Sequence, residues 1–485
     1  MAHIGIIKSN LIFGGAQIVQ MLTIVLRAKL IAVMLGSAGM GLNAILQSVL
    51  HIVNNVCACG IMQSSVREIS QAYSEENLGR LHRKIHIFRR LLYWSAGIGF
   101  GVCALGAWPL SIVSLGHTAD VGAFVVLGLG TMFFTLMQGE VSILQGTRQV
   151  KALAISSIIG STVSLAVCVP CYYFFSMKGV ALSIVLANFV YWLIYLFFTR
   201  KLKVGRQAIT LRQALKEGKP MIRLGFVLML GSVLVTLFTY LTNISIRLLG
   251  SISDVGLYQG AAAIATQSIL VITSVLAADF FPRLSAVVTN KREQNQLINE
   301  QLNIVVLAVV SIASVVVCFA PVIINLLLSP DFLEIASMLR LMAVALLFRG
   351  LWIVMSYVIL ANGDRKAYFF YDGLLGNGIN FMLCIMAYNF WGLTGIGVAH
   401  IVSSVLVAVL LFAVSYHKYD ARLTKANRQT LYVAIVMAAT TYTLSVFCGM
   451  MIAVFALLVI LCWSLNRINR QYHVSAHIQN RLKRK

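Results

Sequence analysis

Residues 302–328 read LNIVVLAVVSIASVVVCFAPVIINLLL, a run of 27 residues without a charged side chain. An apolar run of about 20 residues crosses the hydrocarbon core of a bilayer as one helix. Similar runs recur along the whole chain, which has 485 residues, 59% of them apolar and 11% charged, and a mean hydropathy of +0.88. A soluble domain carries about 25% charged residues. The composition therefore excludes a soluble protein and predicts an all-α polytopic membrane protein.

Short breaks rich in Gly, Ser, Pro or charged residues divide the chain into about 14 predicted transmembrane helices. The last two are barely long enough to cross, so 12 is the alternative count. The predicted spans are 9–35, 40–66, 91–115, 120–146, 152–176, 179–199, 224–249, 253–281, 302–328, 333–362, 367–390, 393–416, 430–448 and 450–466.

The basic residues predict the orientation of these spans. The chain has 38 Lys and Arg against 15 Asp and Glu, a net charge of +23, and 32 of the basic residues fall in every second loop. The loops on the opposite side contain one basic residue, Lys178. The positive-inside rule then places both termini in the cytoplasm. Because the charge belongs to membrane loops, and no soluble basic domain or base-stacking motif is present, nucleic-acid binding is excluded.

The two halves of the chain resemble each other. Residues 35–42 recur at 249–257, residues 143–148 at 359–365 and residues 178–181 at 394–397, each about 215 positions later. Six spans separate each segment from its repeat. Because six is an even number of crossings, both halves have the same orientation in the membrane. We predict four parts, namely an N-terminal six-helix lobe at 1–199, a cytoplasmic basic linker at 200–223, a C-terminal six-helix lobe at 224–416, and an additional transmembrane hairpin with a basic cytoplasmic tail at 417–485.

Four short segments carry a family resemblance, namely LGSAGMGL at 35–42, VREIS at 66–70, DVGLY at 254–258 and FPRLS at 281–285. With the six-plus-six layout, they resemble the multidrug/oligosaccharidyl-lipid/polysaccharide exporter (MOP) superfamily over about residues 1–416. Within it, the chain is similar to the polysaccharide-transporter branch of Wzx-like O-antigen and lipid III flippases. The resemblance implies two six-helix bundles around a central cavity that opens to alternate leaflets of the bacterial inner membrane. It also implies an undecaprenyl-diphosphate-linked oligosaccharide as cargo, and a polysaccharide polymerase and a chain-length regulator as partners.

Basic residues inside the spans are the main candidates for cargo binding. A charge there costs about 2.5–3.5 kcal/mol on insertion scales and normally faces protein or water. A planar guanidinium can hold a diphosphate by paired charge-assisted hydrogen bonds. We therefore predict Arg27 and Arg349, and also Arg247, as diphosphate-binding residues. Snorkelling to the headgroups is the alternative for Arg247 and Arg340, and the favoured interpretation of Lys29.

Polar side chains recur every three or four residues on the first, second and seventh spans, which places them on one face of each helix. Amide and hydroxyl groups can hydrogen-bond to sugars, although ordinary helix packing also produces such stripes. An isolated histidine can likewise be a packed, neutral imidazole. The candidate sugar-binding residues are Gln20, Thr23, Asn43, Gln47, His51, Asn54 and Asn243.

Three acidic residues, Glu140, Asp279 and Asp372, lie within spans near their predicted cytoplasmic ends. Pairing with basic loop residues is the favoured interpretation, and binding a coupling proton or cation is the other. The nine cysteines all lie in apolar runs and are interpreted as small buried hydrophobic residues. The CxxC spacing of Cys168 and Cys171 has no second ligand pair nearby, so no metal or cofactor is expected.

The leading hypothesis is a flippase that moves a lipid-linked oligosaccharide from the cytoplasmic to the periplasmic leaflet. A cation-coupled multidrug exporter of the same superfamily would need carboxylates and aromatics in its cavity, whereas the mid-span charges here are arginines. A polysaccharide polymerase or ligase would need a sizeable outer loop, and every predicted outer loop is short. The absence of G-x-S-x-G, H-E-x-x-H and P-loop motifs also argues against an enzyme.

Overall fold

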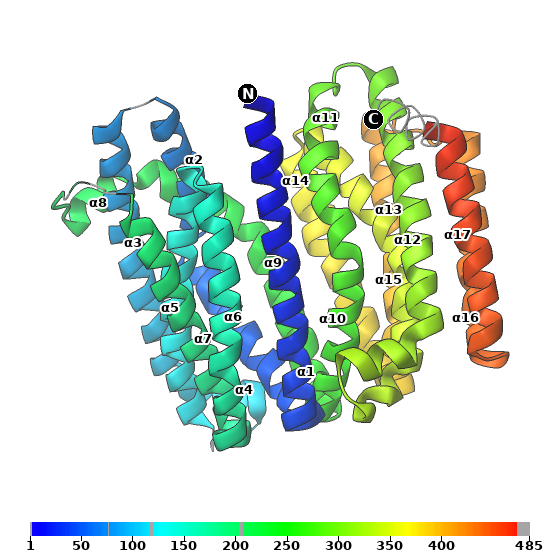
Figure 1. The fold of residues 1–485 in the computed structure, drawn as a ribbon, viewed down its shortest axis with the longest axis horizontal. Coiled ribbons are helices and arrows are strands. Elements are labelled where there is room, and N and C mark those ends of the chain that lie inside the picture. The colour runs from blue at the N-terminus through cyan, green and yellow to red at the C-terminus, as the bar shows by residue number, and fades with distance from the viewer. Residues whose placement is uncertain are drawn as a thin grey trace. The chain divides into compact units, whose positions relative to one another are not determined.

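The computed structural model describes residues 2–75, 77–116, 118, 120–202, 205 and 207–472 (Figure 1). Every regular element among them is a helix, which confirms the predicted all-α class. The chain divides into two compact units, Met1–Gly256 with Leu327–Ser329 and Leu257–Leu326 with Pro330–Lys485.

Unit 1 is a bundle in which α5 packs between α3 and α7, while α1 packs along α6 and α9. Ile69, Phe88 and Ile143 are fully buried where α2, α3 and α5 meet. The elements are α1 (Ala2–Cys57), α2 (Ile61–Ser74), α3 (Leu78–Leu105), α4 (Ala107–Leu115), α5 (Val121–Gly146), α6 (Val150–Phe175), η1 (Ser176–Lys178), α7 (Gly179–Arg200), α8 (Leu211–Glu217), α9 (Lys219–Leu249) and the start of α10 (Ile252–Val275).

Unit 2 is built around the close packing of α13 on α15, and a hairpin of α16 and α17 lies against α12. Two short π-helices, η2 and η4, interrupt its longer helices. The elements after α10 are η2 (Leu276–Phe280), α11 (Phe281–Ala286), α12 (Lys291–Leu327), η3 (Pro330–Ile335), α13 (Ala336–Ala361), α14 (Arg365–Ala367), η4 (Tyr368–Gly376), α15 (Asn377–Tyr419), α16 (Lys425–Phe447) and α17 (Met450–Tyr472).

The loop between α13 and α14 is fixed by one carboxylate. Asp364 accepts the Ala367 amide at 2.9 Å, and so caps α14. It also accepts hydrogen bonds from Lys418 Nζ at 3.0 Å and Tyr419 Oη at 2.9 Å at the end of α15. These donors lower the pKa of Asp364 to about 2. The carboxylate is therefore charged at any ordinary pH, and it joins the start of α14 to the end of α15.

Nine helices in the described part of the chain are long and apolar enough to cross a membrane, or ten if α3 and α4, bent by 65°, form one span. Three of the nine are more than twice as long as one crossing, which takes about 20 residues. They run from Gly15 to Cys57, from Val150 to Arg200 and from Arg365 to Tyr419. Each changes direction at a residue with positive φ, namely Gly36, Ser176 and Gly392. These turns coincide with breaks in the sequence-predicted spans.

The unit boundary differs from the boundary that the repeat suggests. Helix α9 packs on α1 and α2 and so belongs to unit 1, whereas the repeat places it at the start of the 224–416 lobe. At Gly60, where φ is +62°, the backbone lies so close to α9 that a Cβ would be 2.1 Å from the Gly225 carbonyl oxygen. The four-part division of the chain remains a prediction from the repeat.

A pair of glycines brings the two repeats into backbone contact within unit 1. A Cβ on Gly41 would lie 1.9 Å from the carbonyl oxygen of Ile252, and a Cβ on Gly256 would lie 1.8 Å from that of Ser37. Gly41 corresponds to Gly256 in the predicted repeat, and Ser37 and Ile252 each lie four residues before the glycine of their own segment. The two contacts are therefore equivalent. The repeated glycines permit a close backbone approach that no other residue allows.

We expect Gly41→Ala and Gly256→Ala each to destabilise the protein by about 1–3 kcal/mol, because the new methyl group meets backbone rather than a movable side chain. Thermal unfolding of the detergent-purified protein measures this change. The control is Gly97→Ala on α3, where a Cβ meets nothing within 4 Å and alanine favours the helix. Equal stability of Gly41→Ala and Gly97→Ala would contradict the prediction.

Candidate functional site

Arg27 on α1 is oriented against α6 by an aromatic side chain. Its Nε donates to Tyr172 Oη at 3.4 Å, and Ser183 Oγ on α7 lies 3.1 Å from the same oxygen. Its Nη2 is buried and has no hydrogen-bond partner in the described residues. A guanidinium has five N–H donors, and Tyr172 carries no charge. Arg27 is therefore positioned but neither neutralised nor saturated.

Two predicted residues precede Arg27 on the same helix and differ in their surroundings. Gln20 Oε1 accepts from Ser157 Oγ of α6 at 3.3 Å, so Gln20 shares the α6-facing side with Arg27. Thr23 Oγ1 donates to the main-chain carbonyls of Val19 and Gln20, at 3.1 and 2.8 Å. Its hydroxyl is thus used within α1.

Two of the predicted amides join helices. Asn54 is buried, and its Oδ1 accepts from Thr135 Oγ1 of α5 at 2.9 Å. Asn243 of α9 is fully buried, and its Nδ2 donates to Ser48 Oγ of α1 at 3.0 Å. These are interhelical hydrogen bonds of the kind that polar residues commonly form between membrane helices.

The remaining predicted residues of the second half of α1 are less engaged. His51 is exposed and packs edge-on against Phe134, with ring centroids 5.3 Å apart. Gln47 and Asn43 are half-buried, one and two helical turns before His51. Asn43 Oδ1 is buried and has no hydrogen-bond partner among the described residues.

A polar pocket of about 270 Å³ lies within unit 1 between α1, α2, α5 and α9. Its lining has no charged side chain, and its size is slightly below the 300–1,000 Å³ typical of small-ligand pockets. Of the candidate residues named from the sequence, only Asn54 lines it. The seven-residue spacing of Gln138 and Gln145 along one face of α5 was the signal for two of the missed residues. The polar groups around it belong to Asn54, Asn55, Gln63, Gln138, Ser142, Gln145 and Ser232.

Arg247, at the end of α9, contacts the C-terminus of α4. Its Nη2 donates to the Val113 carbonyl at 3.3 Å, and a Cβ on Gly116 would lie 2.4 Å from its Nη1. The last carbonyls of a helix lack intrahelical partners and attract cations. The structure thus gives Arg247 a helix-capping contact, and its predicted part in diphosphate binding is untested.

In unit 2, Arg349 on α13 lies over an aromatic ring, with its guanidinium carbon 3.6 Å from the Trp352 ring centroid. Trp352 Nε1 donates to Asp372 Oδ1, and Ser356 Oγ donates to the same oxygen at 2.7 Å. Asp372 lies on η4, and π-helical turns often occur at functional sites. The structure thus brings Arg349 and Asp372, which sequence reasoning treated separately, to one indole, with Arg349 over its face and Asp372 at its Nε1 edge.

The other two predicted acids form ion pairs with arginines. Glu140 on α5 is only 1% exposed and accepts from Arg89 Nη2 at 2.8 Å and from Thr199 Oγ1 at 2.5 Å. Asp279 on η2 pairs with Arg283 at 3.0 Å, where both side chains are more than half exposed. The pairing interpretation therefore describes the geometry of both residues.

The helical fold is similar to that of solved transporter structures. The lipid II flippase MurJ in an inward closed conformation matches with a TM-score of 0.73 at 14% identity, over 95% of this chain and 99% of that chain. An inward-facing multidrug resistance MATE transporter of the superfamily matches with a TM-score of 0.67 at 17% identity, over 86% and 95%. A MOP superfamily transporter from Pyrococcus furiosus matches with a TM-score of 0.57 at 16% identity, over 85% of this chain and 96% of that chain.

Sequence comparison identifies the family. Residues 6–288, more than half of the chain, match the family described as polysaccharide biosynthesis protein, and the chain belongs to it. No curated protein matches the sequence. The family and the fold agree with the resemblance that the sequence motifs indicated.

We expect Glu140→Gln to destabilise the protein by about 3–5 kcal/mol, because it leaves the Arg89 guanidinium without its buried counter-charge. Chemical unfolding of the detergent-solubilised protein measures this loss. Replacing both partners by apolar residues, as Arg89→Met with Glu140→Leu, should recover much of the stability.

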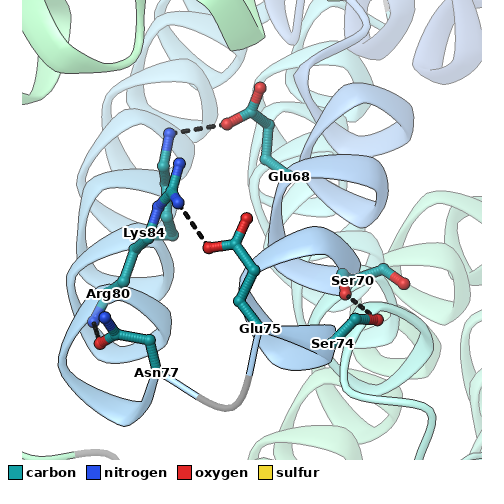
Figure 2. Close-up of polar contacts among 7 residues, drawn as sticks. All are labelled: Glu68, Ser70, Ser74, Glu75, Asn77, Arg80 and Lys84. Atoms are coloured by element: carbon teal, nitrogen blue, oxygen red, sulfur yellow. Dashed lines mark hydrogen bonds and ion pairs between the residues drawn. The ribbon is translucent and has the colours of Figure 1, made fainter.

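The matched control is Glu75→Gln. Glu75 pairs with Arg80 in the exposed α2–α3 turn (Figure 2), where the side chains are 37% and 52% exposed. Exposed pairs contribute about 0–1 kcal/mol. If Glu140→Gln were no less stable than Glu75→Gln, the buried pair would not have the structural role that its contacts indicate.

Proposed function

We propose that this protein is a flippase that moves an undecaprenyl-diphosphate-linked oligosaccharide, such as an O-antigen repeat unit, from the cytoplasmic to the periplasmic leaflet by alternating access. The observation that carries the proposal is Arg27, an intramembrane cation with a buried, unpartnered Nη2 among the described residues. Such a group costs free energy unless it meets water or an anionic ligand. The polysaccharide biosynthesis family supports a cargo that contains sugars.

Two kinds of residue fit the two chemistries of this cargo. Arg27 in unit 1 and Arg349 in unit 2 would each be suited to bind phosphate oxygens of the diphosphate, because each keeps its positive charge and its guanidinium plane is oriented, by Tyr172 and by Trp352 respectively. The amide-lined pocket of unit 1 would bind sugar hydroxyls, which need neutral donors and acceptors. Arg247 would assist from the end of α9.

The drive for transport is the membrane potential, a coupling ion, or both. Moving one uncompensated negative charge outward gains about 2.3 kcal/mol per 100 mV. Asp372 is the best placed of the three acids for coupling, because unlike Glu140 and Asp279 it forms no ion pair in the described residues, and its Oδ1 accepts from the neutral Trp352 and Ser356. We place the protein in the bacterial inner membrane with cytoplasmic termini, in a pathway with a polymerase and a chain-length regulator.

A multidrug exporter of the same fold fits the described residues less well. A cationic drug requires a free carboxylate beside an aromatic face. In unit 2 the combination exists, but Arg349 already covers the Trp352 ring and Asp372 accepts two hydrogen bonds. Sensitivity of a deletion strain to cationic dyes separates this function from lipid flipping.

In a strain that lacks this protein, we expect lipid-linked oligosaccharide to accumulate in the cytoplasmic leaflet and surface polysaccharide to be lost. Arg27→Ala and Arg349→Ala should each reduce complementation by about tenfold or more, because each removes charge-assisted hydrogen bonds to the diphosphate. Leaflet-resolved labelling of the lipid-linked sugar and blotting of surface polysaccharide measure the two effects.

Arg340→Ala is the matched control. Arg340 is also an intramembrane arginine, but its Nε donates to the Val317 carbonyl at 3.3 Å, so it is used in packing. It should retain complementation at equal membrane abundance. Wild-type surface polysaccharide in Arg27→Ala and Arg349→Ala would remove these residues from the site, and no accumulation in the deletion strain would refute the flippase.

A further inference from the structure

A second, strongly basic pocket lies in unit 2, at the open end of the α16–α17 hairpin. Its volume is about 580 Å³. It combines three cations, a hydroxyl group and two large aromatic side chains from the two helices. The residues that matter are Lys425, Arg428, Thr430, Tyr432, Trp463 and Arg467.

The charge of this pocket is not compensated. Lys425, Arg428 and Arg467 form no ion pair in the part of the chain that the structure describes. After Asp420 the sequence contains no acidic residue at all. Three cations around one pocket repel one another, so an anion that bridges them would be bound favourably.

The start of α16 is held rigidly against α12. Asn299 Oδ1 accepts from the Thr424 amide at 2.9 Å, and Asn427 Nδ2 donates to the Asn299 carbonyl at 2.7 Å. Thr424 also caps α16 by accepting from the Asn427 amide at 3.3 Å. The pocket wall that carries Lys425 is therefore preorganised, which lowers the entropic cost of binding.

The opposite wall is fixed as well, and the surface beyond it is apolar. Arg467 Nη2 donates to Thr430 Oγ1 at 3.3 Å, which joins the two helices at the pocket. Deeper along the hairpin, Val436, Leu458 and Val459 are about half exposed. A ligand with an anionic head and apolar tails matches a basic pocket that is followed by an apolar surface.

Aromatic and basic residues together mark the level of lipid headgroups. Tyr432 is 70% exposed beside the pocket, and Trp463 lines it. Tyr and Trp collect at the membrane–water interface, and basic residues collect on the cytoplasmic side. Basic pockets between helices at this level bind anionic lipid headgroups.

We propose that this pocket binds the headgroup of an anionic phospholipid of the cytoplasmic leaflet. Lys425, Arg428 and Arg467 hold the phosphate, and the acyl chains lie along the exposed apolar surface of the hairpin. The site is separate from the cargo site, and it anchors the hairpin that lies outside the predicted internal repeat.

The test is native mass spectrometry of the purified full-length protein titrated with phosphatidylglycerol or phosphatidylcholine. We expect one saturable phosphatidylglycerol site that phosphatidylcholine does not fill. The double variant Lys425→Gln with Arg428→Gln should bind phosphatidylglycerol about tenfold or more weakly, because two of the three cations are lost. Equal retention of the two lipids, or unchanged retention by the double variant, overturns the proposal.

The control is Arg365→Gln with Lys366→Gln, which removes the same charge from two exposed residues outside this pocket. It should retain the site. Two competitors test other sources of the anion. Displacement of the lipid by millimolar inorganic phosphate would indicate a free-anion site, and displacement by undecaprenyl diphosphate would indicate a cargo site. Either result overturns the proposal, and persistence of the lipid supports it.

A thermal-stability readout guards against variants that fold poorly. A ligand that binds only the folded state raises the unfolding temperature, so phosphatidylglycerol should stabilise the wild type and the control variant but not the double variant. If the double variant is not recovered as a monodisperse protein, Lys425→Gln alone serves, because the exposed Lys425 side chain makes no hydrogen bond among the described residues. An unchanged lipid-induced stabilisation of Lys425→Gln would then refute the site.

Discussion

A charged side chain inside an apolar helix must find a partner, and this constraint organises much of the structure. Hydration is lost in the bilayer core, so each intramembrane arginine has to be compensated by the protein, by water or by a ligand. Arg89, two residues before the predicted span 91–115, meets the buried carboxylate of Glu140. Arg340 bonds to a main-chain carbonyl. Arg27 differs from Arg89 because it has no carboxylate partner in the described residues: its Nε contacts the neutral Tyr172, and its Nη2 is buried without a hydrogen-bond partner there.

Close packing of the backbone explains the repeated glycines. Gly41 and Gly256 recur in sequence because each lets the backbone of one repeat approach that of the other, and the two contacts are equivalent. A residue with any side chain would separate the helices there. The close contact fixes the position of the second half of α1, and hence of the polar stripe that it carries. The two repeated glycines therefore have a packing role.

Sequence reasoning predicted the helical class, the breaks inside long helices and the family, because hydropathy and glycine placement are local signals. It could not predict partners across helices. The periodicity that placed Asn54 and Asn243 on polar faces does not say which helix each face meets, and both residues form interhelical hydrogen bonds. The pairing of Glu140 with Arg89 joins residues 51 positions apart. The amide pocket likewise draws on four helices, so only part of it was visible from the sequence.

The two arginines that sequence reasoning ranked highest share a property that only the structure reveals. Arg27 is oriented by a phenol and Arg349 by an indole, and in the described residues neither has a carboxylate within ion-pair distance. An aromatic partner fixes the guanidinium plane without cancelling its charge. Arg89, held by Glu140, is stable for the opposite reason and has little affinity left for an anion. A site for a diphosphate requires the first kind of support, because a neutralised arginine would have to break its ion pair before it could bind.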